Sequence, residues 1–374
     1  MGNLALNDLY EGFRNPKTIK ALVKHIEIEA MKLEHDIHIM EVCGGHTHSI
    51  VKYGLHQLMP QNIHFIHGPG CPVCVLPKER IDHAYTLAMQ RDVILVTLGD
   101  MIKVPGSKGS LQDARAKGAD VRYLYSPLDT LKIAKENPDK KVIFFAIGFE
   151  TTTPMTAVLI QHVIDEGIEN ILFHINHIEI PEPMKVLLDA KRSKIDAFIG
   201  PSHVSVISGA KIYEEFPKAY HTPVVVAGFE PVDILEGILM LLKQFNDNRC
   251  EVEIEYTRSV TREGNPVAQK LIDTFFEKRK HFRWRGIGDI AQSALQLKKE
   301  FAYLDAEKIY SDHLTDDQID DHTQCICGEI LMGAAKPFEC RLFGNACTPS
   351  SPLGSCMVSS EGACAAYYKY GKVI

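Results

Sequence analysis

The chain has 374 residues, of which 45% are hydrophobic, and 41 basic against 48 acidic side chains give it a formal net charge of −7. A weakly acidic chain is a poor general nucleic-acid binder, because phosphate binding requires clustered lysine and arginine. No apolar run reaches the length of a membrane span and the first ten residues lack the features of a signal peptide, so we expect a cytoplasmic protein with no membrane or nucleic-acid partner.

Short apolar runs, rich in valine, isoleucine and phenylalanine, alternate with helical patterns over the first two thirds of the chain. The expected strands are His38–Val42, Ile63–His67, Val93–Leu98, Val121–Tyr125, Val142–Ile147, Ile171–Ile175, Ala197–Ile199 and Val224–Ala227. The helices between them include Lys78–Gln90, Leu128–Glu136 and Thr156–Glu166. Nearly uniform apolarity is typical of parallel strands buried on both faces, so the pattern predicts an α/β fold with right-handed crossovers.

This pattern predicts three domains. Residues 1–120 would form one parallel-sheet α/β lobe and residues 121–230 a second. After residue 230 the strand–helix alternation ends, and residues 231–374 would form a C-terminal helical and loop-rich domain. We interpret the basic run KRKHFRWR at residues 278–285 as a solvated helix end.

Ten cysteines are many for a chain expected in the cytosol, where thiols are kept reduced and structural disulfides are rare. Metal binding or redox chemistry explains them better. Three lie between residues 43 and 74, one stands alone at residue 250, and six crowd between residues 325 and 364. Two separate thiol centres are therefore expected.

The first centre begins at Cys43, in the sequence MEVCGGHTHSI. Cys43 follows an expected strand, at the end where open α/β sheets bind ligands, and the two glycines after it permit close approach of a ligand. A cysteine near a helix N-terminus should have a lowered pKa, which favours the metal-binding thiolate. His46 would add a hydrogen bond, a proton or a further ligand, and a purely structural hydrogen bond is the alternative.

Cys71 and Cys74 follow the next expected strand, in HGPGCPVCVLP. Their spacing brings both sulfurs within bonding distance across a turn and suits a redox pair or half a metal site. The two thiol motifs end strands of the same parallel lobe, and such ends lie at one edge of a sheet. We therefore expect Cys71 and Cys74 to be redox-active and close to Cys43; a rigid turn without chemistry is the alternative.

A third loop, GFETTTP, follows the strand that ends at Ile147. Glu150 is its candidate residue, as a base or as a hydrogen-bond partner of the thiol site. The threonines that follow would cap the next helix. None of the loops contains a Walker motif or GxGxxG, so the sequence does not support a nucleotide site.

The six C-terminal cysteines lie amid glycine, proline and serine, in a segment that requires a stabilising cross-link to be ordered. An iron–sulfur cluster held by four thiolates explains them best. Zinc and a disulfide knot are the alternatives, and no paired Cys-x₂-Cys zinc knuckle occurs. We assign the ligands of a [4Fe–4S] cluster as Cys325, Cys340, Cys347 and Cys364.

Cys325 and Cys327 are separated by one residue and in an extended segment would point to opposite sides, so both are not expected to bind one cluster. Cys327 and Cys356 are then left as a pair. A dithiol beside a [4Fe–4S] cluster resembles ferredoxin:thioredoxin reductase, in which a cluster supplies electrons to a disulfide. Inert core cysteines are the alternative.

Taken together, CGGHTH, GPGCPVC, GFETTTP, GPSHVS, AGFEPVDIL and the array ending CMVSSEGAC resemble the HypD family of hydrogenase maturation factors. The motifs occur in the family's order over residues 43–364, and together they are highly specific. The resemblance implies two α/β lobes with an iron–sulfur domain, and it carries the family's iron ligand onto Cys43.

The resemblance also implies a function, the assembly of the Fe(CN)₂CO unit of [NiFe] hydrogenase. The partners would be the chaperone HypC, whose N-terminal cysteine shares the ferrous iron, and HypE, which carries cyanide as a thiocyanate made from carbamoyl phosphate with HypF. The iron with its cyanide and carbonyl ligands would be a transient cargo that passes to the hydrogenase large subunit. Electrons would come from the cluster through the two thiol pairs.

Two other functions fit part of the sequence. An iron–sulfur-dependent thiol–disulfide reductase would explain CPVC and the C-terminal array, but would leave CGGHTH without a role. A pure scaffold would hold its partners around a structural cluster and would not use the CPVC thiols. We interpret the chain as a metallocentre-assembly factor with redox activity.

Overall fold

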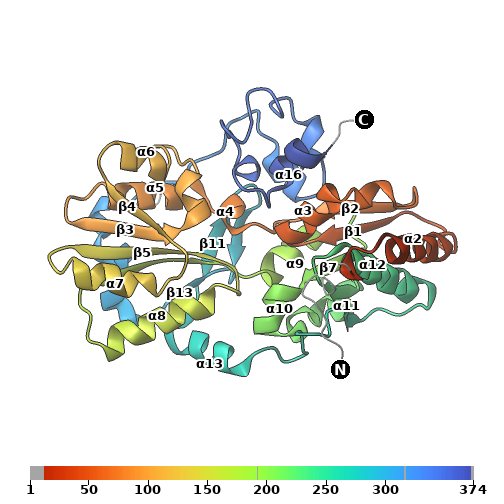
Figure 1. The fold of residues 1–374 in the computed structure, drawn as a ribbon, viewed down its shortest axis with the longest axis horizontal. Coiled ribbons are helices and arrows are strands. Elements are labelled where there is room, and N and C mark those ends of the chain that lie inside the picture. The colour runs from red at the N-terminus through yellow and green to blue at the C-terminus, as the bar shows by residue number, and fades with distance from the viewer. Residues whose placement is uncertain (1–11, 192, 316, 372–374) are drawn as a thin grey trace.

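The computed structural model describes residues 12–191, 193–315 and 317–371 of the chain. Two parallel sheets stand side by side, and the C-terminal residues lie across the junction between them (Figure 1). We name the parts the first lobe, built on the sheet that contains β1, the second lobe, built on the sheet that contains β3, and the cysteine-rich domain, residues 325–371. The predicted α/β class with two parallel-sheet lobes is confirmed.

The first lobe contains a five-stranded parallel sheet. Its strands, in spatial order, are β2 (Ile63–His67), β1 (Ile37–Glu41), β7 (Ala197–Pro201), β8 (Val224–Ala227) and β9 (Val252–Ile254). Helices α2 (Pro16–Ala30) and α12 (Pro231–Asn246) pack together over one face of this sheet. The central strands are buried along their whole length, which explains their nearly uniform apolarity.

The second lobe contains a four-stranded parallel sheet. Its strands, in spatial order, are β4 (Asp120–Leu124), β3 (Val93–Leu98), β5 (Lys141–Gly148) and β6 (Ile171–His177). The helices packed around it include α5 (Lys78–Ala88), α6 (Leu111–Ala116), α7 (Asp129–Glu136), α8 (Thr153–Asp165) and α13 (Pro266–Phe275). Every strand predicted from the apolar runs is present in one of the two sheets, with ends shifted by at most two residues.

The predicted domain boundaries are wrong. The lobes do not divide the chain at residue 120, because the chain leaves the first sheet after β2, builds the whole second sheet and returns with β7. β1 consequently pairs with β2 on one side and with β7 on the other. Nor does a third domain begin at residue 231, since α12 packs on the first sheet and α13 on the second lobe. An apolar run identifies a buried strand but not the neighbours that the strand takes.

The basic run at residues 278–285 does not form a solvated helix end. Helix α13 stops at Phe275, and the run continues from β10 (Phe276–Lys278) into β11 (His281–Trp284). These strands pair antiparallel with β13 (Leu295–Leu297) and β12 (Gly288–Ala291), respectively. Phe282 and Trp284 alternate with charged residues and are buried on one face of β11, a period of two that indicates a strand.

Further short helices connect these elements. They are α9 (Pro181–Asp189), α10 (Ser202–Ser208), α11 (Glu215–Tyr220), α14 (Ala306–Ile309) and the 3₁₀ turns η1 (Leu55–Gln57), η2 (Gly99–Lys103), η3 (Ala210–Tyr213), η4 (Lys299–Leu304) and η5 (Ser311–His313). Within the described ranges, no helix is both long and apolar enough to cross a membrane.

The cysteine-rich domain touches the two turns that carry the N-terminal thiol motifs. Its elements are α15 (Cys327–Leu331), η6 (Pro337–Glu339), η7 (Ser355–Met357) and α16 (Ala363–Tyr370). Helix α16 packs on α3 (Gly44–Lys52), and η7 packs on α4 (Pro72–Val75). Tyr367 reaches down to His67 at the end of β2, with 3.0 Å between the hydroxyl and Nε2, and Lys336 donates to the Phe65 carbonyl. These contacts fix the domain over the carboxyl ends of β1 and β2.

Candidate functional site

The two N-terminal thiol motifs meet at one edge of the first sheet. Strands β1 and β2 pair in parallel with Glu41 opposite His67, so the chain leaves both strands at the same level. The Gly44 N–H donates to the Gly70 carbonyl at 3.0 Å. A Cβ on Gly70 would lie only 2.3 Å from the Cys43 Cα, so the approach requires glycine. The predicted proximity of the two thiol motifs is confirmed.

Cys43 caps helix α3 and is buried. Its sulfur accepts a 3.4 Å hydrogen bond from the Gly45 N–H and lies 3.9 Å from both ring nitrogens of His203. Burial raises the pKa of the Cys43 thiol far above its usual range, because desolvation outweighs the Gly45 hydrogen bond and the charge of Glu361 acts in the same direction as burial. The predicted lowering of this pKa by the helix N-terminus is therefore wrong.

His46, assigned to the thiol site from the sequence, faces the other way. Its Nε2 lies 2.9 Å from the Gly228 carbonyl, and its ring packs on Phe229. Burial lowers the pKa of His46 to about 4, so the ring is neutral at pH 7. His46 joins α3 to the end of β8, and the histidine beside the Cys43 sulfur is instead His203, from α10.

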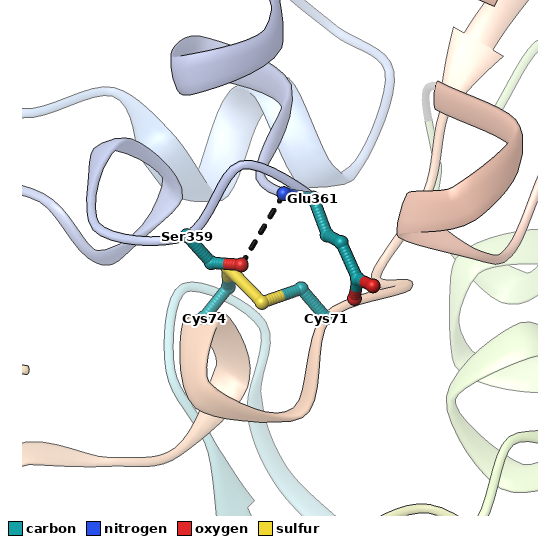
Figure 2. Close-up of a disulfide and its surroundings, with 4 residues drawn as sticks. All are labelled: Cys71, Cys74, Ser359 and Glu361. Carbon is teal, nitrogen blue, oxygen red and sulfur yellow. Dashed lines mark hydrogen bonds between the residues drawn. A yellow bond between two sulfur atoms is a disulfide. The ribbon is translucent and has the colours of Figure 1, made fainter. Parts of the chain in front are cut away.

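Cys71 and Cys74 form a disulfide with 5.2 Å between their Cα atoms, as their spacing predicts. Two residues of the cysteine-rich domain lie beside it (Figure 2). The Ser359 hydroxyl accepts a 3.2 Å hydrogen bond from the Glu361 N–H. Glu361 also touches the Cys43 turn, since a Cβ on Gly44 would lie 2.4 Å from the Glu361 Cβ. Glu361 therefore stands between the two thiol motifs.

A cleft of about 460 Å³ opens at the disulfide, and all three parts of the molecule contribute to its wall. Gly70, Cys71 and His203 come from the first-lobe edge, and Thr151 with its neighbours comes from the loop after β5. Ser359 and Glu361 close it from the cysteine-rich domain. Cys43 lies directly behind Gly70 and His203.

Glu150 does not reach this cleft. Its Oε1 accepts a 2.9 Å hydrogen bond from the Ile180 N–H, just before α9, and its Oε2 has no hydrogen-bond partner in the described part of the chain. Burial raises the pKa of Glu150 to about 8, and the negative charge of Glu179 adds to the shift. The carboxyl group thus joins two loops of the second lobe, and its predicted place beside the thiols is wrong.

The sequence interpretation missed His203 and Glu361. Both occur in motifs that were noticed, GPSHVS and SSEGAC, but neither residue was singled out. His203 follows β7, and only the pairing of β7 with β1 brings it to Cys43. Glu361 arrives from the far end of the chain. The available signal was the general rule that polar residues after parallel strands converge.

The C-terminal cysteines gather around one small cavity of about 10 Å³. The cysteines that line it are Cys325, Cys327, Cys340, Cys347 and Cys364. Cys356 is buried beside them, in hydrogen-bond contact with Cys327 and Cys364. The rest of the wall is apolar, from Ile330, Leu342, Phe343 and Met357. A set of thiols without carboxylate or imidazole in the lining fits a soft, thiolate-bound iron–sulfur cluster.

Cys325 and Cys327 do not point to opposite sides, as the sequence interpretation held. Helix α15 begins at Cys327, so the chain turns between them and the two sulfurs lie 3.3 Å apart. The absent side chain of Gly354 leaves room for both, since a Cβ there would lie within 2.6 Å of either sulfur. The hydrogen bond between the two sulfurs lowers the pKa of Cys325. Sulfurs in contact cannot each bind a separate iron corner of one cluster, so one ligand from this pair is still expected.

One other group of potential ligands is a closed polar network. His83, His174 and Glu307 bring their polar atoms within 4.8 Å of one another in the second lobe. However, Asn176 donates to the His174 Nδ1 at 3.0 Å, so the His174 Nε2 carries the proton and donates it to His83. Two arginines pair with Glu307. The group therefore has a structural role.

Comparison with known proteins gives matches over nearly the whole chain. A family model named HypD and described as "Hydrogenase formation hypA family" matches residues 17–371. The hydrogenase maturation factor HypD of Rhizobium leguminosarum bv. viciae is 51% identical, over 90% of this chain and 88% of that protein. The protein of the same name from Escherichia coli K12 is 45% identical, over 96% of each chain.

Among solved structures, the E-1-hydroxy-2-methyl-but-2-enyl-4-diphosphate reductase of Plasmodium falciparum aligns with 70% of this chain and 86% of its own. Its TM-score is 0.22 at 14% identity, which is too low to support an inference.

The close approach of Gly70 to Cys43 predicts a selective effect of alanine. Gly70→Ala should lower the free energy of unfolding by about 1–3 kcal/mol, because the new methyl group overlaps the Cys43 backbone. Gly99→Ala is the matched control, since Gly99 lines the same cleft and a Cβ there meets nothing within 4 Å. Urea unfolding measures both, and equal effects of the two variants would contradict the packing described.

The buried Glu150 predicts a pH dependence of stability. Its pKa of about 8 in the folded chain exceeds its ordinary value of 4.5, so the folded state binds more protons between these values and stability falls as pH rises through this range. Glu150→Gln stays neutral and should gain thermal stability relative to the native chain between pH 6 and pH 9. Parallel melting-temperature profiles for the two proteins would refute this.

Proposed function

This chain belongs to the HypD family of hydrogenase maturation factors, and from that premise we propose that it is the scaffold and redox protein on which the Fe(CN)₂CO unit of [NiFe] hydrogenase is assembled. The observation that carries the proposal is the meeting of Cys43 and the Cys71–Cys74 disulfide at one edge of the first sheet, beneath a domain with six cysteines. We expect it to act in the cytoplasm, where thiols are kept reduced.

Cys43 is the proposed ligand of the iron cargo. The buried sulfur lies near the acidic side chains of Glu41 and Glu361, and desolvation outweighs its backbone donors, so its thiolate is unfavourable without a cation. A ferrous ion would supply that positive charge, and thiolate suits a soft iron that carries cyanide and carbonyl ligands. The chaperone HypC would share the iron through its N-terminal cysteine, and the finished unit would pass to the hydrogenase large subunit.

The Cys71–Cys74 pair is the proposed source of electrons at the cleft. HypE would bring cyanide bound to sulfur as a thiocyanate, and release of cyanide breaks that carbon–sulfur bond. One thiocyanate and two thiols give one thiol, one hydrogen cyanide and one disulfide, so a reduced Cys71–Cys74 pair balances the step. The pair lies in the wall of the cleft, where such a substrate could reach it.

The cysteine-rich domain would hold a [4Fe–4S] cluster through Cys325, Cys340, Cys347 and Cys364. When bound, such a cluster supplies single electrons. We propose that Cys327 receives them, and its contacts with Cys325, Cys364 and Cys356 support this role. The segment that contains Cys356 packs on α4, the helix of the CPVC motif. The Cys327–Cys356 pair therefore lies on a continuous path of contacts towards Cys71 and Cys74.

The thiol–disulfide reductase and the pure scaffold are less favoured alternatives. A reductase would have no use for Cys43 buried behind the cleft wall. A scaffold would have no use for a disulfide in that wall.

The ligand assignment predicts which cysteines keep the iron. Anaerobically purified protein should contain about four irons per chain, held with sulfide. Cys340→Ala and Cys347→Ala should lose the iron, whereas Cys327→Ala and Cys356→Ala should retain it, since these two are assigned to the redox pair. Elemental analysis and visible absorption measure both. Stoichiometric zinc in place of iron, or loss of iron on removal of Cys327, would contradict the assignment.

The proposed function is tested by infrared spectroscopy of the chain purified together with HypC. The native complex should show cyanide and carbonyl stretching bands, and Cys43→Ala should abolish them while HypC still co-purifies. Cys250→Ala is the matched control, because Cys250 lies on the first lobe outside the cleft lining. Bands of undiminished intensity in Cys43→Ala would refute the role of Cys43.

A further inference from the structure

A tight turn after β11 lies between the two thiol centres. The Arg285 N–H donates to the Val75 carbonyl at 2.7 Å, one residue after Cys74. The next residue, Gly286, packs on Gly328 so closely that a Cβ on Gly328 would lie 2.5 Å from the Gly286 carbonyl oxygen. Gly328 directly follows Cys327. The turn therefore touches both the CPVC helix and the start of the cysteine-rich domain.

The Arg285 side chain is buried within this contact, with only 4% of its surface exposed. Its Nε donates to both carboxylate oxygens of Asp321, at 2.8 and 2.9 Å, and its Nη2 donates to one of them. Asp321 lies four residues before Cys325, so the ion pair anchors the segment that leads into the first cysteine. A bidentate arginine–carboxylate pair fixes orientation as well as position.

Arg285 retains one nitrogen that this ion pair does not use. Its Nη1 is buried and has no hydrogen-bond partner among the residues that the structure describes. A buried donor left unsatisfied is costly, and one on a charged group more so. Arg285 is held near Cys325 by geometry, because its ion-pair partner Asp321 lies four residues before that cysteine and the next residue, Gly286, packs on Gly328.

We infer that Arg285 is a positioning residue for the cluster. It anchors residues 321–325, the segment that ends at Cys325, through its ion pair with Asp321. Its buried charge and the N–H groups of Nη1 stabilise the reduced cluster. This inference rests on the proposed [4Fe–4S] cluster. Reduction adds one electron, and therefore one negative charge, to a centre already made negative by its thiolates. A positive charge and an N–H donor near the cluster favour the reduced form and raise the reduction potential.

Arg283 supplies a matched control two residues away. It lies on β11 and also pairs with acidic residues, Glu79 and Asp320, but its side chain is 24% exposed. Arg283→Gln and Arg285→Gln remove the same charge and break comparable ion pairs with neighbouring acidic residues. Only the second removes the buried donor next to the Cys325 limb.

The test is a redox titration of the full-length protein with dithionite, followed by electron paramagnetic resonance of the reduced cluster. Arg285→Gln should shift the reduction equilibrium at least tenfold towards the oxidised form, which is about 59 mV to lower potential for one electron. Arg283→Gln should leave the potential unchanged. Equal shifts in both variants, or none in Arg285→Gln, would overturn the inference.

A second pair of variants tests the sign of the effect. Asp321→Asn removes a negative charge from the same limb and should raise the potential, whereas Asp320→Asn should not. A merely structural role would give shifts of the same sign for Arg285→Gln and Asp321→Asn, so opposite signs distinguish the two. If Arg285→Gln fails to hold iron, the Asp321→Asn result decides. Native protein without iron would overturn the proposed cluster and this inference together, whereas native protein with iron and no charge effect would overturn the inference alone.

Discussion

One backbone hydrogen bond, from the Gly44 N–H to the Gly70 carbonyl, joins the two turns on which the proposed chemistry depends. It forms because β1 and β2 are parallel neighbours in register and because Gly70 has no side chain to keep the Cys43 turn away. The same register places Glu41 opposite His67, and the buried carboxyl group of Glu41 hydrogen-bonds to the His67 ring. Adjacent strands in a buried parallel sheet thus bring two thiol motifs together that are 28 residues apart in sequence (71 − 43).

The cysteine-rich domain is built onto that edge. His67 in turn hydrogen-bonds to Tyr367 of α16, and Lys336 donates a hydrogen bond to the β2 backbone. Glu361 reaches down between Cys43 and the disulfide, and Arg285 joins the CPVC helix to the limb that leads into Cys325. These contacts are buried and hydrogen-bonded, so the domain would lose several satisfied polar groups if it moved away. The proposed electron donor and the proposed iron site are therefore held in a fixed relation.

The sequence predicted the local elements well, because burial on both faces leaves a strong mark on a strand. It also predicted that Cys43 and Cys71 would be neighbours, since that follows from where parallel strands end. What it could not give was the partner of each strand: β7 returns to β1 from 156 residues away (197 − 41), and with it comes His203. Glu150 and His46 also follow strands, but Glu150 bonds to the Ile180 N–H and His46 to the Gly228 carbonyl. The hydrophobic periodicity of the sequence does not reveal such contacts. Likewise, the sequence interpretation treated Cys325 and Cys327 as part of an extended segment, with side chains on opposite sides. The chain instead turns into α15 between them, so their sulfurs lie on the same side.

The central claim is that the Cys43 and Cys71 turns are in contact, and native thiols can test it directly. In a Cys74→Ala variant Cys71 loses its disulfide partner, and a new disulfide requires Cα atoms within about 7 Å of each other. After mild oxidation, peptide mass spectrometry should find Cys71 joined to Cys43. If Cys71 remains reduced, or pairs only with cysteines other than Cys43, the two turns do not share one site and the account is contradicted.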